Sequence, residues 1–257
     1  MKRRRRLAGL VTGVLRVVLH RRPRTACVIL AAGSSTRMGG ETPKQFLPVC
    51  GVPILIRALF TFDSCPVIDE IVIVTRESDI QAVRDLCAKY RISGKLKAVI
   101  AGGETRQKSA FLGVEATSSP CRFVAIHDAA RCLVTSDVIR SVVETAYRRR
   151  CATAVYPVTD TIKRVDGPGR IRGTVDRTEL CAAATPQAFE RDYYIAVAAY
   201  AEKKGTVVTD DNALFEAVGQ TVYTVDGGSD NFKVTTPSDL IRAEAVIRAR
   251  EKKETVK

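Results

Sequence analysis

Apolar and polar residues follow two alternating patterns along the chain from residue 25 onward. Short, almost continuous apolar runs predict buried β-strands, and apolar residues at three- and four-residue spacing predict amphipathic helices between them. The expected strands are 27–30, 70–75, 96–101, 122–126, 151–158 and 221–225, and the expected helices are 53–62, 78–90, 107–116, 136–147, about 190–204, 210–218 and 237–251. This order predicts an α/β protein with one mostly parallel sheet and helices on both faces.

Polar residues gather in three loops that each follow a predicted strand. They occupy residues 33–37, 102–109 and 127–131. In a parallel α/β sheet the ligand site lies at the carboxyl ends of the strands. We therefore expect the three loops to meet at one edge of the sheet and to form one site.

Residues 159–180 interrupt the pattern with a polar and charged stretch around Gly167-Pro168-Gly169. A Gly/Pro turn between two short segments predicts a β-hairpin. The stretch has too few apolar residues to build a core of its own. We expect a projecting β-arm that packs on a second subunit, and hence a homodimer.

The first loop combines small residues with cations. Small residues at 31–39 allow the backbone to approach a phosphate chain, and turned backbone N–H groups can bind an anion. Arg37 adds a forked, permanent charge and Lys44 adds a mobile one. The loop alone is equally consistent with an ordinary Gly/Ser turn. It matches neither GxxxxGK[ST] nor GxGxxG, which disfavours P-loop ATPases and dinucleotide-binding dehydrogenases.

The third loop places a carboxylate where a phosphate chain is expected. Asp128 at the end of a strand suits Mg²⁺, a hard cation that prefers oxygen ligands. It either ligates the metal, directly or through water, or only orients substrate hydroxyls. Asp230 is a weaker second candidate for a metal contact. His127 is interpreted as a structural residue, with a role as general base as the alternative.

Charge and aromatic content disfavour a nucleic-acid-binding protein. The formal net charge is +13, but residues 1–24 contain nine basic residues and no acid, which leaves +4 for residues 25–257. Aromatic residues make up 6% of the chain and there is no Trp, so stacking platforms for single strands are not expected. A mildly basic body suits an enzyme with anionic substrates.

The basic N-terminal segment has three interpretations. Its apolar run, residues 7–19, is too short to span a bilayer. It is a disordered accessory extension, a basic amphipathic helix with weak contact to a membrane surface, or a targeting segment. The eight cysteines contain no CxxC pair and fall mostly in apolar segments, which predicts buried, reduced thiols and a cytoplasmic protein.

Nine sequence pieces in one order carry a resemblance over residues 25–250. They are AAGSSTRMG (31–39), PKQFL (43–47), GGETRQKS (102–109), HDAAR (127–131), DTIKR (160–164), TVDR (174–177), TPQ (185–187), TDD (209–211) and DNFKVTTPSDL (230–240). The chain resembles the cytidylyltransferases of the non-mevalonate isoprenoid pathway that act on 2-C-methyl-D-erythritol 4-phosphate. It departs from their pattern at Leu30, Ser35 and Cys132. The resemblance assigns 25–250 to the enzyme domain, with the arm at about 159–180, and leaves 1–24 as an extension and 251–257 as a tail.

The resemblance implies a Rossmann-like three-layer fold, a β-arm that embraces a second subunit, and a magnesium-dependent reaction. CMP passes from CTP to the acceptor, giving 4-diphosphocytidyl-2-C-methyl-D-erythritol and pyrophosphate. A phosphate monoester is mostly dianionic near pH 7, so the acceptor needs no general base. The alternative acceptor is another polyol phosphate, ribitol 5-phosphate, whose cytidylyltransferases share the first loop, PKQFL, HDA and KVTTP. The HDAAR and TVDR pieces favour the isoprenoid enzyme.

The resemblance also implies roles for individual residues. Arg37, Lys44 and Lys233 are the expected catalytic cations. Segment 102–109 is the expected base-recognition loop. The alternative interpretation of these residues, which is compatible with the first, is a turn that caps the next helix, with Glu104 in the first helical turn. The full expected CTP-binding set is Ala31, Ala32, Gly33, Gly103, Glu104 and Ser109. The expected acceptor-binding set is Asp128, Arg131, Thr161, Thr185 and Arg177, with Arg177 reaching in from the partner's arm, and Asp128 is also the expected metal contact.

Overall fold

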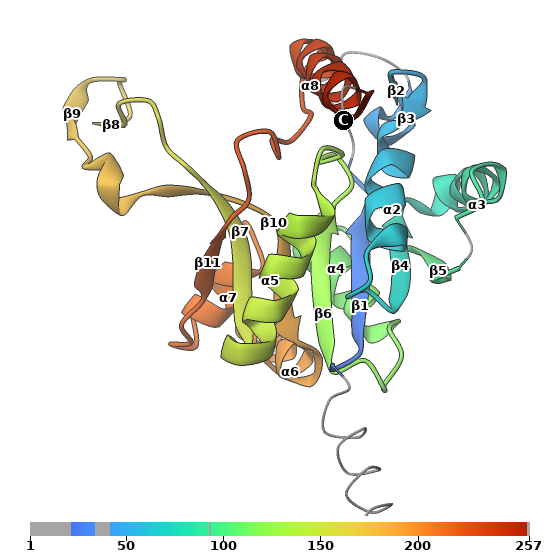
Figure 1. Ribbon diagram of the computed structural model, residues 1–257. Helices are drawn as coiled ribbons and strands as arrows, with labels where there is room; N and C mark the ends of the chain where they lie inside the picture. Colours follow the sequence, from blue (N-terminus) through green and yellow to red (C-terminus); the bar gives the residue numbers. More distant parts are fainter. Residues whose placement is uncertain (1–21, 34–41, 93, 256–257) are drawn as a thin grey trace, which may run out of the picture.

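A seven-stranded sheet forms the centre of the computed structural model, which describes residues 22–33, 42–92 and 94–255 (Figure 1). Each strand pairs in parallel with its neighbours except β10, which is antiparallel to both β6 and β7. The spatial order is β11 (Tyr223–Asp226), β7 (Cys151–Pro157), β10 (Cys181–Glu190), β6 (Phe123–Asp128), β1 (Thr25–Leu30), β4 (Glu70–Thr75) and β5 (Leu96–Ala101). The predicted mostly parallel sheet is confirmed.

Helices cover both faces of the sheet and bury both sets of strand side chains. On β1, Cys27 and Ile29 pack into one core cluster and Val28 packs into the other. One face is covered by α2 (Ile54–Ser64), α3 (Ile80–Lys89) and α5 (Ser136–Arg149), and the other by α4 (Arg106–Glu115), α6 (Arg191–Lys204) and α7 (Asn212–Glu216). Burying each large aliphatic side chain stabilises the folded chain by about 1.5–3 kcal/mol. The two helical layers therefore fix the position of the sheet edge. The predicted three-layer α/β fold class is confirmed.

Helix α4 approaches the sheet unusually closely at Gly113. A Cβ atom there would lie 2.7 Å from Val74 Cγ2 and would also collide with Val28 Cγ1. Gly113→Ala is therefore expected to lower the free energy of unfolding by about 1–3 kcal/mol, because β1 or α4 must move to admit the methyl group. Chemical denaturation measures this change. Gly173→Ala on the arm, where a Cβ meets no atom within 4 Å, is the control, and equal stability of the two variants would contradict the packing argument.

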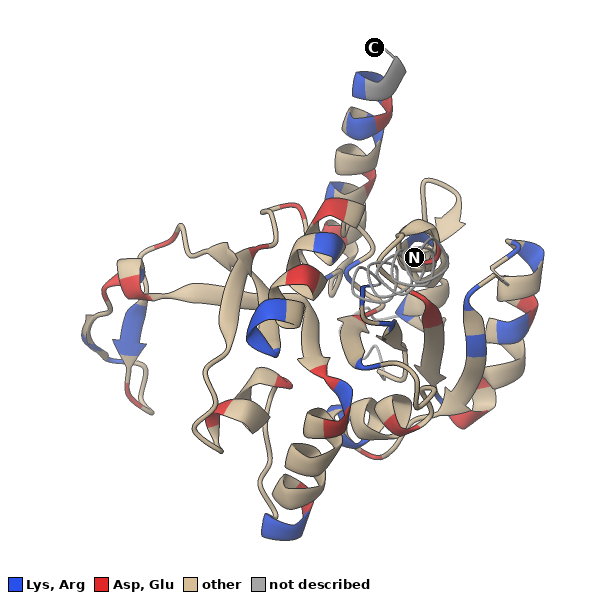
Figure 2. Ribbon diagram, turned by 60° about the horizontal axis from the view of Figure 1, so that its bottom comes forward, with Lys and Arg blue, Asp and Glu red and all other residues tan. Residues whose placement is uncertain are grey.

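Strand β10 of the central sheet was not predicted, and helix α8 is longer than predicted. Strand β10 has the sequence CAAATPQAFE, and alanines with a central proline do not favour a strand. It is a strand because β6 and β7 pair with it on both sides. Helix α8 spans Pro237–Thr255, so it continues into the stretch expected to be a tail. In Figure 2, basic and acidic residues are interspersed along the coloured part of this helix.

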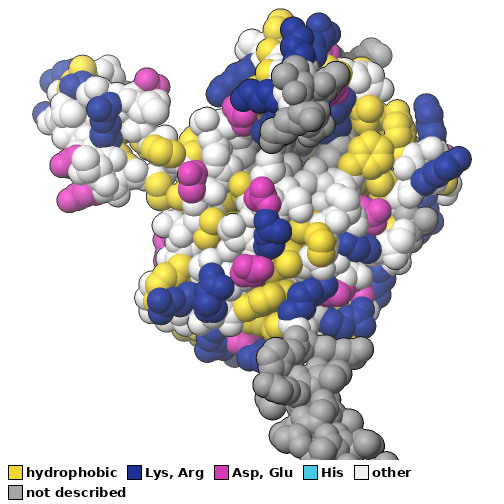
Figure 3. All heavy atoms as spheres, in the orientation of Figure 1, with side chains coloured by type: hydrophobic (Ala, Val, Ile, Leu, Met, Phe, Trp, Pro, Cys, Tyr) yellow, Lys and Arg dark blue, Asp and Glu magenta, His cyan; other side chains and the backbone are white. Residues whose placement is uncertain are grey.

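The predicted arm is present as a two-stranded antiparallel hairpin. Strands β8 (Lys163–Val165) and β9 (Ile171–Thr174) are joined by a turn in which Gly169 has a φ of 84°. The hairpin projects from the body in Figure 1 and forms a distinct lobe in Figure 3. A short 3-10 helix, Arg177–Glu179, leads from it back into β10.

Two smaller features hold parts of the chain that flank the sheet. The short strands β2 (Pro48–Val49) and β3 (Val52–Pro53) pair next to the 3-10 helix Lys44–Phe46. Val49 of β2 packs with α8 in a third core cluster. Arg22 forms an ion pair with Asp69 at 2.7 Å, so the last residues of the basic segment contact the body. Residues 1–21 lie outside the described part, and no helix within that part is long and apolar enough to cross a membrane.

All eight cysteines are free thiols. Six are buried, Cys50 is half-buried and Cys181 on β10 is exposed. Burial raises the pKa of Cys151 to about 12 and that of Cys132 to about 11, so both stay protonated at neutral pH. The predicted buried thiols are confirmed for all but Cys50 and Cys181.

Candidate active site

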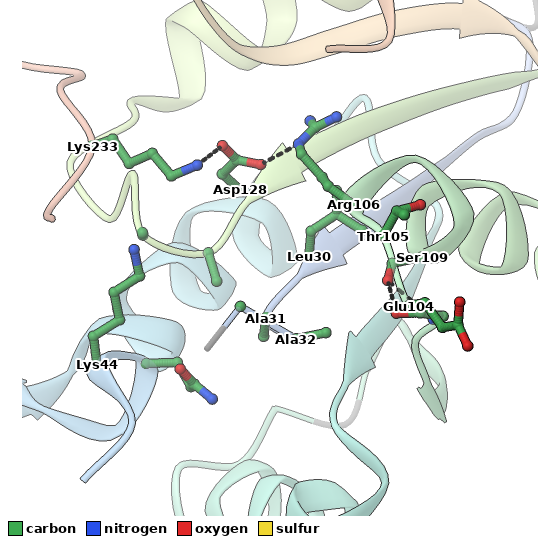
Figure 4. A pocket seen from close by; sticks show the side chains of 15 residues that line it. Leu30, Ala31, Ala32, Lys44, Glu104, Thr105, Arg106, Ser109, Asp128 and Lys233 are labelled. Carbon is green, nitrogen blue, oxygen red and sulfur yellow. Dashed lines mark hydrogen bonds and ion pairs between the residues drawn. The ribbon is translucent and has the colours of Figure 1, made fainter. Parts of the chain in front are cut away.

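A pocket of about 380 Å³ opens at the carboxyl ends of β1 and β6 (Figure 4). The predicted loops after β1, β5 and β6 all contribute to it, together with a segment before α8. Its lining is Leu30, Ala31, Ala32, Gly33, Lys44, Gln45, Gly103, Glu104, Thr105, Arg106, Ser109, Asp128, Ala129, Ala130 and Lys233. The expectation that the polar loops meet at one sheet edge is confirmed for the described residues.

Lys44 enters the pocket from the 3-10 helix that follows Pro43. Its Nζ lies 3.3 Å from the carbonyl oxygen of Val234, the residue that follows Lys233 in the chain. The neighbouring Gln45 is buried and donates to Asp79. Lys44 and Lys233 therefore approach the pocket from two different elements and place two cations on one side of it.

Asp128 lies between two cations at the end of β6. Its Oδ2 is 2.7 Å from Lys233 Nζ, and its Oδ1 is 3.2 Å from Arg106 Nε (Figure 4). Burial alone would raise the pKa of Asp128, but the charges of Arg106 and Lys233 outweigh it and hold the pKa well below its usual range. Asp128 is therefore a carboxylate at any pH near neutrality.

His127 belongs to a buried hydrogen-bond chain behind Asp128. Its Nε2 donates to the carbonyl oxygen of Arg131 (3.2 Å), since a carbonyl only accepts, and its Nδ1 then accepts from the hydroxyl of Thr185 (2.9 Å). The Thr185 hydroxyl in turn accepts from the backbone N–H of Asp128. Burial lowers the pKa of His127 to about 3, so the ring is neutral. This geometry gives His127 a structural function, in agreement with the preferred interpretation.

The lowered pKa of His127 predicts a pH dependence of stability. The unfolded chain protonates His127 near pH 6.5, whereas the folded chain does so near 3. The unfolded state therefore binds more protons between these values, and the free energy of unfolding falls as pH is lowered, by up to about 1.4 kcal/mol per pH unit. Denaturation of His127→Gln in metal-free buffer from pH 7 to 4 should show a shallower slope than the native chain. Parallel slopes would contradict the assignment.

The loop before α4 is fixed by two hydroxyl groups. Thr105 caps α4 by accepting from the backbone N–H of Lys108 at 3.0 Å. Ser109 accepts from the backbone N–H of Gly103 at 3.1 Å. A Cβ on Gly102 would lie 2.6 Å from the Ser109 oxygen, which explains the glycine. The turn before the helix is confirmed, but Glu104 precedes the first helical turn, so its expected place in that turn is wrong.

The predicted site residues fall into four groups. Lining the pocket are Ala31, Ala32, Gly33, Lys44, Gly103, Glu104, Ser109, Asp128 and Lys233. Arg131 and Thr185 are buried behind Asp128 and do not line it. Thr161 and Arg177 lie exposed on the arm, where Arg177 donates to the carbonyl oxygen of Thr159. Arg37 lies outside the described residues.

Arg106 lies at the pocket although the sequence did not single it out, whereas Asp230 was a candidate and lies elsewhere. Arg106 was not singled out, although it lies in the quoted GGETRQKS piece and directly contacts Asp128. Asp230, the second metal candidate, lines a separate cavity of about 180 Å³ and lies 3.4 Å from Arg250. The structure therefore does not bring Asp230 to the same pocket as Asp128.

The donor set of the pocket fits a magnesium ion held mainly by a substrate. Among the described residues no three His, Cys, Asp or Glu side chains form a metal-binding group. Asp128 and Glu104 are the carboxylates that line the pocket. Mg²⁺ is usually bound by one or two carboxylates together with phosphate oxygens and water, so a single carboxylate beside a triphosphate is a sufficient protein contribution.

Comparison with known proteins identifies one family. The profile of the 2-C-methyl-D-erythritol 4-phosphate cytidylyltransferase family matches residues 25–249. The protein of that name from Symbiobacterium thermophilum is 40% identical over 220 residues, which cover 86% of this chain and 91% of that protein. The one from Halalkalibacterium halodurans is 42% identical over 226 residues, covering 88% and 98%.

Solved structures carry the same similarity. The 2-C-methyl-D-erythritol 4-phosphate cytidylyltransferase from Thermus thermophilus aligns with a TM-score of 0.72 and 32% identity over 88% of this chain and 99% of that one. The 4-diphosphocytidyl-2C-methyl-D-erythritol synthase from Anaerococcus prevotii aligns with a TM-score of 0.78 and 28% identity, covering 88% and 96%.

Proposed function

The chain belongs to the 2-C-methyl-D-erythritol 4-phosphate cytidylyltransferase family, and we propose that the pocket described above is where it joins its two substrates. The chain transfers CMP from CTP to 2-C-methyl-D-erythritol 4-phosphate, a step of isoprenoid biosynthesis. It is a nucleotidyltransferase. Ribitol 5-phosphate, the alternative acceptor, is not favoured by any of these relatives.

The observation that carries the proposal is the convergence of Lys44, Lys233 and Asp128 on one pocket beside two backbone loops. Two anionic substrates repel each other, so the main obstacle is to bring them together and to stabilise charge at phosphorus. Cations that approach from separate elements can each hold one phosphate group. We assign Lys44 to the triphosphate and Lys233 to the acceptor phosphate.

The reaction forms one bond and breaks one. A phosphate oxygen of the acceptor attacks the α-phosphorus of CTP, a new P–O bond forms, and the bond to pyrophosphate breaks. The attacking oxygen carries no proton near pH 7, because the second pKa of a phosphate monoester is about 6. Lys44, together with Arg37 from the preceding loop, stabilises the charge that develops on the phosphorus and the leaving group.

The nucleotide half of the pocket is assigned to backbone groups. Backbone at Ala31, Ala32 and Gly33 lines one side, and Gly103 with Ser109 lines another. Cytosine has an amine that donates to a backbone carbonyl oxygen, and a ring nitrogen and a carbonyl oxygen that accept from backbone N–H groups. We assign the cytosine ring to the Gly103–Ser109 side, with Glu104 at its rim.

We assign Asp128 to the acceptor hydroxyls and to Mg²⁺ when the metal is bound. Its two oxygens already accept from Arg106 and Lys233, so new partners must share them. A bound magnesium ion supplies charge neutralisation between the phosphate groups of CTP. Glu104 is the other carboxylate at the pocket rim.

We also propose a homodimer in which the arm of one subunit completes the partner's site. Val165 and Ile171 pair across the hairpin and are exposed by 58% and 66%, so the arm offers apolar surface without a core beneath it. Thr161 and Arg177 lie on the arm and do not line the pocket of their own chain. Light scattering should give twice the chain mass, and deletion of 163–174 should give a monomer.

The remaining assignments follow from charge and thiol content. We propose a cytoplasmic enzyme, because its cysteines are free thiols and six of them are buried. We also propose that it does not bind nucleic acid, because residues 25–257 carry only +4 of the net charge. Weak contact between the basic segment 1–24 and a membrane surface is proposed as an accessory property. Deletion of 1–24 should abolish any lipid binding and leave CTP turnover unchanged.

The test of function is pyrophosphate release by the purified protein with magnesium and defined substrates. CTP with 2-C-methyl-D-erythritol 4-phosphate should react, whereas CTP with ribitol 5-phosphate should react much more slowly, and UTP should replace CTP poorly. Faster reaction with ribitol 5-phosphate would reassign the acceptor. Absence of pyrophosphate release with either acceptor would refute the proposed function.

A further inference from the structure

Asp211 is a buried carboxylate for which the proposed reaction has no role. It belongs to the TDD piece at 209–211, and it is 1% exposed. Tyr194 donates its hydroxyl to Oδ1 at 2.7 Å, and the backbone N–H of Asp211 donates to Gln187 at 3.0 Å. A carboxylate in such a place is costly unless a cation compensates it.

Arg106 is that cation, and it also contacts the pocket. Its Nη1 lies 2.8 Å from Asp211 Oδ2, while its Nε lies 3.2 Å from Asp128 Oδ1. A guanidinium is planar and its donors are fixed in direction, so contacts through two different edges fix its orientation. The chain Tyr194–Asp211–Arg106–Asp128 thus runs from the buried layer of α6 to the pocket surface.

Arg106 and Lys233 differ in how they are held. Asp211 anchors Arg106 from behind, whereas Lys233 reaches Asp128 with a flexible side chain that is 35% exposed. When an acceptor phosphate enters, Lys233 gains a second anionic partner that competes with Asp128. Arg106 also lines the pocket, but its second carboxylate partner, Asp211, is buried, so this contact remains when a phosphate enters.

We propose that the Asp211–Arg106 ion pair is a positioning device that keeps Asp128 oriented toward the acceptor while Lys233 turns to the acceptor phosphate. The inference rests on the proposed function of the pocket and adds two residues to it. Asp211 acts only through Arg106 and touches neither substrate. Tyr194 acts one step further back by holding Asp211.

A double-mutant cycle tests the device. Asp211→Asn should lower kcat/KM for the acceptor by about 10- to 100-fold, since a displaced catalytic group costs that much. The KM for CTP should stay within about twofold, because Thr105 and Ser109 fix the nucleotide loop independently. In an Asp128→Asn background, the same change should have an effect of less than about twofold.

A merely structural role for Asp211 predicts a different result. The effects of Asp211→Asn and Asp128→Asn on kcat/KM would then multiply, and the KM values for both substrates would rise together. Either result would overturn the inference. Asp192→Asn changes an exposed aspartate that pairs with the half-buried Arg191; it is the matched control and should behave as the native chain.

Tyr194→Phe keeps the inference testable if Asp211→Asn does not fold. The ring remains in place, and only the hydroxyl that holds Asp211 Oδ1 is lost. Tyr194→Phe should lower kcat/KM for the acceptor several-fold. In the Asp128→Asn background, the same substitution should have almost no effect. A folded Tyr194→Phe protein with native kinetics would overturn the inference. An inactive native chain would instead refute the proposed function, so the two failures are distinguishable.

Discussion

Replacing Lys44 with alanine should lower kcat by about 10²- to 10³-fold with little effect on folding. Removing one charge that stabilises a phosphorus-centred transition state commonly has this effect. The side chain donates a 3.3 Å hydrogen bond to the carbonyl oxygen of Val234, and losing such a bond changes stability by only about 1 kcal/mol. Steady-state pyrophosphate release measures the change.

Lys203→Ala is the matched control for Lys44→Ala. Lys203 lies exposed in the last turn of α6, away from the pocket, and its removal should leave turnover unchanged. Thermal unfolding should show that both variants retain the fold. A Lys44→Ala protein with near-native turnover would contradict the assignment of Lys44 to the triphosphate.

Mixed dimers of two inactive variants should recover activity. Arg177→Ala removes a cation from the arm, and Lys233→Ala removes one from the pocket. If the arm completes the partner's site, a mixed dimer contains one site that lacks both cations and one intact site. After denaturation and joint refolding, about a quarter of all sites should therefore be intact, because half of the dimers are mixed.

The recovered activity must depend on mixing of subunits. Each variant refolded alone should remain at its own low activity, and co-expression with two different affinity tags allows the mixed dimer to be isolated. That mixed dimer should show about half the native activity. Activity no higher than the mean of the two variants would count against a composite site and would return Arg177 to a role within its own chain.

The spacing of apolar residues predicted the strands and helices that bury one or both of their faces in the core. The 70–75 and 96–101 strands agree with β4 and β5 residue for residue. Strand β10 was missed because its own alanines and Pro186 do not favour a strand. It is extended because it pairs with β6 and β7, which precede it in the sequence and flank it in the sheet. Tertiary pairing decided that element, not local preference.

The site was predictable where loop position alone decides which residues meet. Asp128 and Ser109 line one pocket, as the strand–loop order predicted, and Lys44 from the PKQFL piece lines it too. Arg106 was not recognised because its two carboxylate partners, Asp128 and Asp211, lie 22 and 105 residues further along the chain. Likewise, the places of Thr185 and Arg131 behind the pocket follow from the hydrogen bonds around His127, which no sequence spacing reveals.

The position of bound nucleotide tests the central claim most directly. A crystal structure with CTP, magnesium and the acceptor should place the triphosphate within hydrogen-bond distance of Lys44 and the cytosine against Gly103 and Ser109, with the acceptor phosphate beside Lys233. Nucleotide bound in the cavity beside Arg250, or with its phosphates turned away from both lysines, would contradict the account.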